Sequence, residues 1–136
     1  MDIKVAKWGV LLAMLTVVLV VVAGCSRAGA EPALPAQAGI QNWHQNGAAG
    51  RYVVPVIRGD AKAVTASTRG LVLTDSDCTP DAQGLSHCHN FIELENGDKI
   101  QIQNNHQMTV HRCLQPGEMV RVAPMHGKWI IVQTRS

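Results

Sequence analysis

The sequence has little charge and few aromatic rings. Charged residues make up 16% of its 136 residues, the formal net charge is +2, and the aromatic side chains are one Tyr, one Phe and three Trp. A nucleic-acid binder needs a basic field for the phosphates and rings on which bases stack, and this chain has neither. We therefore expect no nucleic-acid partner.

The sequence motifs of the common enzyme classes are also missing. The sequence contains no nucleophile elbow, phosphate-binding loop, dinucleotide fingerprint or zinc-protease helix motif. Its central acidic residues occur where turns and solvated strand faces are expected; they are Asp75, Asp77, Asp81, Glu93 and Glu95. We therefore expect that the protein is not an enzyme.

A long apolar run lies near the N-terminus. Lys4 and Lys7 precede the segment WGVLLAMLTVVLVVVAG, residues 8–24, which carries no charge. A basic flank, an apolar core and small residues at the end are the order of a secretory signal peptide. Because a bilayer span needs about 20 apolar residues, an uncleaved membrane helix is the alternative.

The end of this run favours the signal peptide. Residues 22–25 read VAGC, with Ala23 and Gly24 directly before Cys25, and this resembles the lipobox of bacterial lipoproteins. The resemblance implies a signal peptide over residues 1–24 and an acylated Cys25 as the first mature residue. Acyl chains that each contribute about 0.8 kcal/mol per buried methylene would then anchor the chain to a membrane. By the same analogy, Ser26 favours the outer membrane, facing the periplasm, in a Gram-negative host.

The composition changes after Cys25. Residues 25–50 are rich in Ala, Gly, Gln and Pro, and their hydrophobic residues are too scattered to form a helical or strand face. We interpret this segment as the lipidated N-terminus and a flexible tether. Trp43 either packs against the domain that follows or is exposed.

Residues 51–136 have the pattern of a small all-β domain. Short segments rich in Val and Ile alternate with turn residues, which is typical of a Greek-key barrel, in outline like an oligonucleotide/oligosaccharide-binding fold, or of a sandwich. About six to seven strands are expected, within the segments 51–58, 69–75, 88–94, 98–104, 107–112, 118–124 and 128–134. Pro55 cannot donate a ladder hydrogen bond, so the first strand is expected at an edge.

The alternation of side chains between the two faces of a strand predicts the register of the hairpin around residues 92–102. Ile92 and Leu94 share one strand face, and Ile100 and Ile102 share a face of the next strand. A two-residue Asn-Gly turn would place these apolar residues opposite polar ones. A three-residue loop with Gly97 in a left-handed bulge pairs Ile92 with Ile100 instead, so we expect the bulged loop.

Three cysteines remain if Cys25 is acylated. In an exported protein, an odd number predicts one disulfide and one free thiol. We expect Cys78 to pair with Cys88, because the nine residues between them form a polar, turn-rich loop. Cys88 with Cys113 is the alternative pair, which would join two strands.

The segment SHCHN, residues 86–90, also suggests a metal site. In an extended strand His87 and His89 project to one face and Cys88 to the other. His87 and His89 could join His111 and Cys113 as four ligands of the kind that zinc or copper prefers. The simpler interpretation is that these histidines are solvated or hydrogen-bonded and bind no cofactor.

Two functions follow from these observations. The first is a membrane-anchored, non-enzymatic lipoprotein of the cell envelope, whose β-domain serves as a structural module or binds an envelope protein or glycan. The second is an envelope lipoprotein that binds zinc or copper through the His and Cys cluster.

Overall fold

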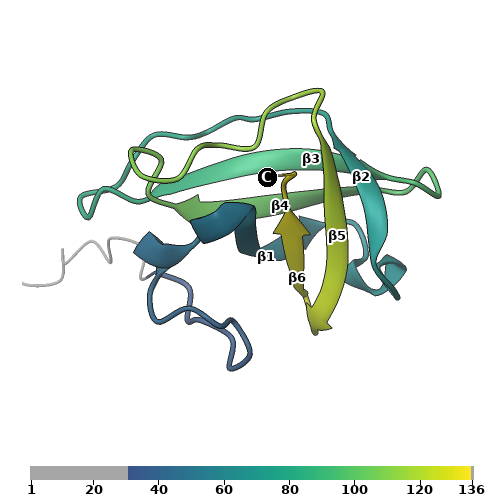
Figure 1. Cartoon of the computed structure of the whole chain (residues 1–136), viewed down its shortest axis with the longest axis horizontal. Coiled ribbons are helices and arrows are strands. Elements are labelled where there is room, and N and C mark those ends of the chain that lie inside the picture. The colour runs from purple at the N-terminus through teal and green to yellow at the C-terminus, as the bar shows by residue number, and fades with distance from the viewer. Residues whose placement is uncertain (1–30, 136) are drawn as a thin grey trace, which may run out of the picture. The chain divides into compact units, whose positions relative to one another are not determined.

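Six antiparallel strands close into a barrel in the computed structural model, which describes residues 31–135 (Figure 1). Around the barrel they follow the order β1-β4-β3-β2-β5-β6, and β6 pairs with β1. The meander β2-β3-β4 with β1 beside β4 is a Greek-key arrangement. The structure therefore confirms the expected small all-β barrel. The strands are β1 (Arg51–Arg58), β2 (Thr68–Val72), β3 (Ser86–Leu94), β4 (Lys99–His106), β5 (Met119–His126) and β6 (Trp129–Gln133).

Aliphatic side chains at alternating positions fill the barrel. Burial alternates without exception along β3, as the period of two requires when one strand face meets a core. Val120 and Val122 of β5 and Ile130 and Val132 of β6 are at most 3% exposed. These side chains form the inward faces of both strands.

The β3–β4 hairpin has the expected register. Ile92 lies opposite Ile100, and the N–H groups of Leu94 and Gly97 donate to the carbonyls of Asp98 and Leu94, both at 2.8 Å. Gly97 has a φ of 91°, a left-handed conformation that favours glycine. The three-residue loop is therefore confirmed, and the apolar side chains of the two strands that it joins lie inside the barrel.

β1 is not an edge strand, so the expectation from Pro55 is wrong: β1 pairs with β6 on one side and β4 on the other. The side chain of Asn46 lies between β1 and β4. Its Oδ1 accepts from the Val53 N–H at 2.7 Å, and its Nδ2 donates to the carbonyls of Val53 and Asn105 at 3.0 and 2.8 Å. The direct β1–β4 ladder begins at Val56. Pro55 is tolerated because it lies between this bridge and the ladder, where no N–H toward β4 is needed.

Part of the expected tether is packed on the barrel. The compact unit begins at Ala33, and it includes the 3₁₀ turns η1 (Trp43–Gln45) and η2 (Ala48–Gly50). Trp43 is 2% exposed and stacks on Trp129, with ring centroids 5.8 Å apart. The domain boundary expected at residue 51 is therefore too late. The composition conceals this packing because a few isolated side chains carry it, with no apolar periodicity.

The expected signal peptide, residues 1–24, and Cys25 lie outside the described residues. Within residues 31–135, no helix has both the length and the apolar character needed to cross a membrane. Anchoring through Cys25 therefore stays a prediction.

The segment 107–112 is a turn and not the expected strand. β4 ends at His106, and the N–H groups of Val110 and His111 both donate to the Gln107 carbonyl at 2.9 Å. Met108 and Val110 are 40% and 62% exposed, so their alternating pattern does not reflect burial. The turn directs the following residues, Cys113 and the buried Leu114, back to the end of the barrel.

Candidate functional site

The inward positions of β3 and β4 change character along the hairpin. On the side of Ile92 and Ile102 away from the hairpin loop, the inward side chains are polar or contain sulfur, and none of them is exposed to solvent. The pairs Cys88–Asn104 and Ser86–His106 lie opposite each other. We call this group the polar layer; it consists of Ser86, Cys88, Asn90, Asn104 and His106.

Much of the polar layer lacks hydrogen-bond partners among the described residues. Buried side-chain atoms without a partner include Ser86 Oγ, Asn90 Oδ1, both amide atoms of Asn104 and His106 Nε2. Burial also lowers the pKa of His106, although a hydrogen bond to the Asn104 carbonyl opposes this effect. Such groups cost stability, so this end of the barrel is not optimised as a core.

Cys88 forms the predicted disulfide with Cys78. The loop around Cys78 also pairs with β3 through two isolated bridges, one on each side of Cys78, between Ser76 and His89 and between Pro80 and Ser86. The disulfide therefore fastens a loop whose two halves are already attached to β3. Because Cys88 points inward, the bond also connects this loop to the polar layer.

Cys113 has a free thiol beside this disulfide. Its Sγ lies 4.0 Å from Cys88 Sγ, so the alternative partner considered from the sequence is also a neighbour. The Tyr52 hydroxyl donates to the Arg112 carbonyl, and the Arg112 guanidinium donates to the Cys113 carbonyl at 3.0 Å. Burial raises the pKa of Tyr52 to about 12, so its hydroxyl stays a donor. These contacts fix the backbone that carries Cys113.

Asp75 completes the cluster. Its Oδ1 accepts a hydrogen bond from Asn90 Nδ2 at 2.8 Å and lies 3.4 Å from Cys78 Sγ. Asn90 is fully buried and also donates to the Thr74 carbonyl at 2.9 Å, so it orients the carboxylate toward the sulfur atoms. Burial and the nearby Asp75 carboxylate raise the pKa of the Cys113 thiol, while the charge of Arg112 lowers it.

We call these four residues the sulfur-carboxylate cluster. The potential ligand atoms of Asp75, Cys78, Cys88 and Cys113 all lie within 4.8 Å of one another. Within residues 31–135, this is the group of three or more His, Cys, Asp or Glu side chains close enough to bind one metal ion. Three sulfur atoms and one carboxylate oxygen therefore lie close together, with the sulfur atoms of Cys78 and Cys88 joined in the disulfide.

The proposed His87, His89, His111 and Cys113 site is not assembled in the structure. His87 and His89 do lie on the strand face opposite Cys88, as predicted. His111 belongs to the 107–112 turn, so it does not share a strand face with Cys113. The structure therefore does not bring the four expected ligands together, and of these four only Cys113 belongs to the sulfur-carboxylate cluster.

The two strand histidines have hydrogen-bonding partners instead. His87 Nε2 lies 2.8 Å from Asp81 Oδ2, and His89 Nδ1 lies 3.1 Å from Asp77 Oδ2. The hydrogen bond from His87 is the main cause of the lowered pKa of Asp81. These pairs attach the chain on both sides of Cys78, at Asp77 and at Asp81, to the outer face of β3, which agrees with the simpler interpretation of the histidines.

Sequence reasoning missed Asp75. It lies three residues before Cys78 in the segment between β2 and β3, and this spacing is a weak local signal. Its position beside the sulfur atoms depends on Asn90, which is distant in sequence. No protein-family model, curated protein or solved structure matches the chain.

Proposed function

We propose that the chain is a lipid-anchored, non-enzymatic lipoprotein of the cell envelope whose barrel binds an envelope protein or glycan. The VAGC junction at residues 22–25 supports the anchor. In a Gram-negative host, the protein would lie on the outer membrane and face the periplasm.

The Cys78–Cys88 disulfide is the observation that carries this proposal. Disulfides persist in exported proteins and are rare in the cytosol. A domain that carries a disulfide and follows a signal-like run in the sequence therefore fits a location in the cell envelope. The disulfide and the junction are independent features that agree.

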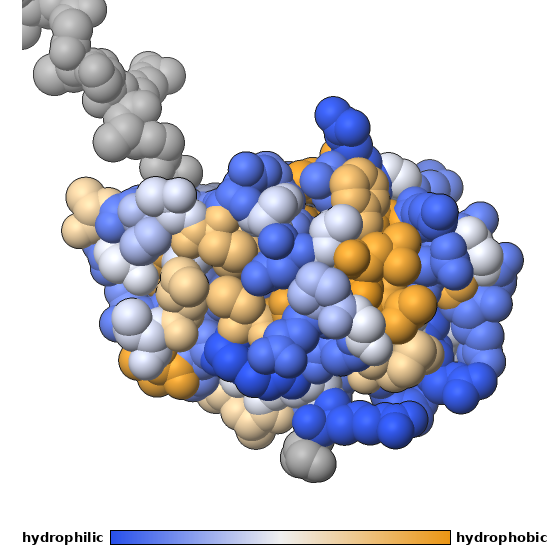
Figure 2. Space-filling model, turned by 90° about the horizontal axis from the view of Figure 1, so that it is seen from above, coloured by the Kyte–Doolittle hydropathy of each residue, from blue (hydrophilic) through white to orange (hydrophobic). Residues whose placement is uncertain are grey.

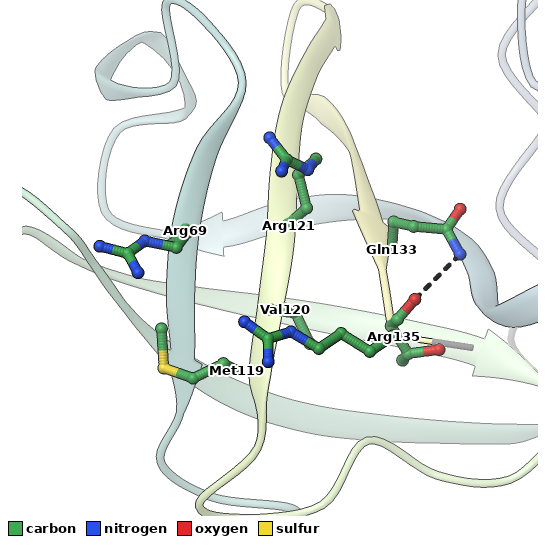
Figure 3. Close-up of a pocket in the computed structure, with 7 residues that line it drawn as sticks. Arg69, Met119, Val120, Arg121, Gln133 and Arg135 are labelled. Atoms are coloured by element: carbon green, nitrogen blue, oxygen red, sulfur yellow. Dashed lines mark hydrogen bonds between the residues drawn. The ribbon is translucent and has the colours of Figure 1, made fainter.

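An arginine pair marks the candidate binding face. Arg69 of β2 and Arg121 of β5 lie directly opposite each other (Figure 3), an arrangement that destabilises a sheet. Glu95 lies 2.7 Å from Arg69, but both side chains are more than half exposed, at 59% and 54%, so the ion pair offsets little. A costly pair of like charges is easier to explain if an anionic group binds there.

The surroundings of this pair suit such a partner. Met119 is 38% exposed beside it. Figure 2 shows one face of the molecule, on which apolar groups lie among hydrophilic ones. Arginine forms paired hydrogen bonds with carboxylates and phosphates, which are common in envelope proteins and glycans. The depression next to the pair is lined by Arg69, Met119, Val120, Arg121, Gln133, Thr134 and Arg135.

Metabolic labelling tests the anchor. Radiolabelled palmitate should enter the wild-type chain in a bacterial host and not the Cys25→Ser variant. Cys113→Ser is the matched control and should label like wild type. Equal labelling of wild type and Cys25→Ser would contradict the lipoprotein assignment.

Photo-crosslinking in cells tests the binding face. A photoreactive residue at Met119 should give a specific adduct that disappears when Arg121→Gln is added. The same residue at the exposed Val110 is the control and should not give that adduct. An adduct from Met119 that persists in Arg121→Gln would argue against recognition by the arginine pair.

A further inference from the structure

We propose that reduction of the Cys78–Cys88 disulfide creates a zinc site in the sulfur-carboxylate cluster. Cys78, Cys88 and Cys113 would supply three thiolates, and Asp75 one carboxylate oxygen. This site would add a redox-controlled metal function that does not depend on the proposed lipid anchor or binding face.

The distances in the cluster fit a tetrahedral zinc ion. With Zn–S bonds of about 2.3 Å and Zn–O bonds of about 2.0 Å, tetrahedral geometry places two sulfur ligands about 3.8 Å apart and a sulfur and an oxygen about 3.5 Å apart. The Cys88–Cys113 sulfur separation is 4.0 Å, and Cys78 Sγ lies 3.4 Å from Asp75 Oδ1. Two edges of the tetrahedron are therefore already formed.

The two bonded sulfur atoms of Cys78 and Cys88 need to separate, while all four ligand atoms already lie within 4.8 Å of one another. Cys88 lies on β3 and is fully buried, and Asp75 is oriented by the hydrogen bond from Asn90. Cys78 lies in a loop with bridges to β3 on both sides, at Ser76 and at Pro80. Once the disulfide is reduced, a rotation of the Cys78 side chain can therefore move its sulfur atom away from Cys88 while the loop stays near the other ligands.

The ligand types favour zinc over copper(I). Copper(I) prefers soft sulfur ligands, whereas zinc accepts thiolates and a carboxylate together. Three thiolates and one carboxylate around Zn²⁺ leave a net charge of −2. The Arg112 guanidinium, whose charge already acts on Cys113, would offset part of that charge.

The chemistry needs an external two-electron reductant, which in the cell envelope would be a dithiol. The dithiol transfers two electrons and two protons to the disulfide, so that it becomes a disulfide itself and Cys78 and Cys88 become thiols. Zn²⁺ then displaces three protons from the three thiols, and the Asp75 carboxylate completes the coordination. Reoxidation by a disulfide removes two electrons from Cys78 and Cys88 and releases the ion.

Cobalt(II) titration of the full-length chain in detergent tests this proposal. Every sample carries Cys25→Ser, so that no thiol at that position can contribute. After reduction by a phosphine and removal of the excess, the chain should bind one Co²⁺ with thiolate charge-transfer bands and the visible bands of a tetrahedral ion. Zn²⁺ should displace the cobalt, and the oxidised chain should bind neither ion.

Variants identify the ligands. Cys113→Ser keeps the disulfide, so its oxidised form can first be shown to fold; after reduction it should bind Zn²⁺ at least about tenfold more weakly. Asp75→Asn should also weaken binding at least tenfold, whereas His89→Ala, the matched control, should not. If the reduced chain loses its near-ultraviolet circular dichroism, added Zn²⁺ should restore it.

Other results would overturn the proposal. These are the absence of Co²⁺ or Zn²⁺ binding by the reduced chain, unchanged affinity in Cys113→Ser or Asp75→Asn, or failure of Zn²⁺ to restore a lost fold. None of these results would affect palmitate labelling or crosslinking.

Discussion

The two ends of the β3–β4 hairpin use the same geometry for different purposes. At the loop end, the inward positions are aliphatic and pack in the barrel core, as Ile92, Leu94, Ile100 and Ile102 do. At the other end, the inward positions form the polar layer, in contact with the sulfur-carboxylate cluster through Cys88. Strand alternation determines which side chains point inward at both ends. Only the residue types distinguish the aliphatic core at the loop end from the candidate site at the other end.

The comparison predicts that the apolar end carries more of the stability. Ile102→Ala removes a fully buried aliphatic side chain from the core and should lower the free energy of unfolding by about 2–5 kcal/mol. Urea denaturation measures the loss. Val110→Ala, at a site 62% exposed, is the control and should change stability by less than about 0.5 kcal/mol. A loss below 1 kcal/mol for Ile102→Ala would contradict the assignment of this end as the core.

At the polar end, the disulfide should be the main stabilising element. Its cysteines are separated by 10 positions in the sequence, and closing a loop of this size contributes about 3 kcal/mol in the chain-entropy model. Cys78→Ser is best made in a Cys113→Ser background, because otherwise Cys88 could bond to Cys113. Urea denaturation of this double variant should show the loss relative to Cys113→Ser alone. Equal stability of the two proteins would show that the loop needs no covalent closure.

The Asn46 bridge offers a third test, at the side of the barrel where β1 and β4 separate. Asn46→Ala leaves the Val53 N–H without its acceptor, and an unsatisfied buried group costs about 1–3 kcal/mol. The Val53 amide should exchange faster with solvent than in wild type. The amide of Val54, which belongs to the β1–β6 pair, is the internal control. Unchanged exchange at Val53 would show that the bridge does not restrain β1.

The smallest expected effect concerns pH and His106. Burial lowers the pKa of His106 from its ordinary value of 6.5, so the unfolded chain binds a proton at a higher pH than the folded chain does. The stability that the neutral His106 contributes is therefore fully present above pH 6.5, and it decreases as the pH falls toward the lowered pKa of the folded chain. His106→Gln should reduce the slope of stability against pH in this range. Parallel curves for the two proteins would exclude His106 as the cause.

The sequence predicts much of the fold because its signals are local. The alternation of strand faces and a three-residue loop at Gly97 together predict the register of Ile92 with Ile100, and a polar loop between Cys78 and Cys88 predicts their disulfide. The wrong predictions concern features that depend on contacts between residues far apart in the sequence. The Asn46 bridge makes Pro55 acceptable inside the barrel, and Trp43 packs on Trp129 from a segment without apolar periodicity.

The candidate site could be predicted only in part for the same reason. Cys88 and Cys113 are recognisable as reactive residue types, but the turn at 107–112 looks like a strand because Met108 and Val110 alternate with polar residues. That error places His111 in the predicted site. Asp75 needs the buried Asn90 to reach the sulfur atoms, and no local pattern indicates this contact.

X-ray absorption spectroscopy of the reduced, zinc-loaded Cys25→Ser chain tests most directly the central claim that the polar end is a metal site. We predict a first shell of three sulfur atoms at about 2.3 Å and one oxygen at about 2.0–2.2 Å. The oxygen should be replaced or lost in Asp75→Asn, while the three sulfur atoms remain. A shell containing two or more imidazole nitrogens, or fewer than three sulfur atoms, would contradict the sulfur-carboxylate cluster as the site.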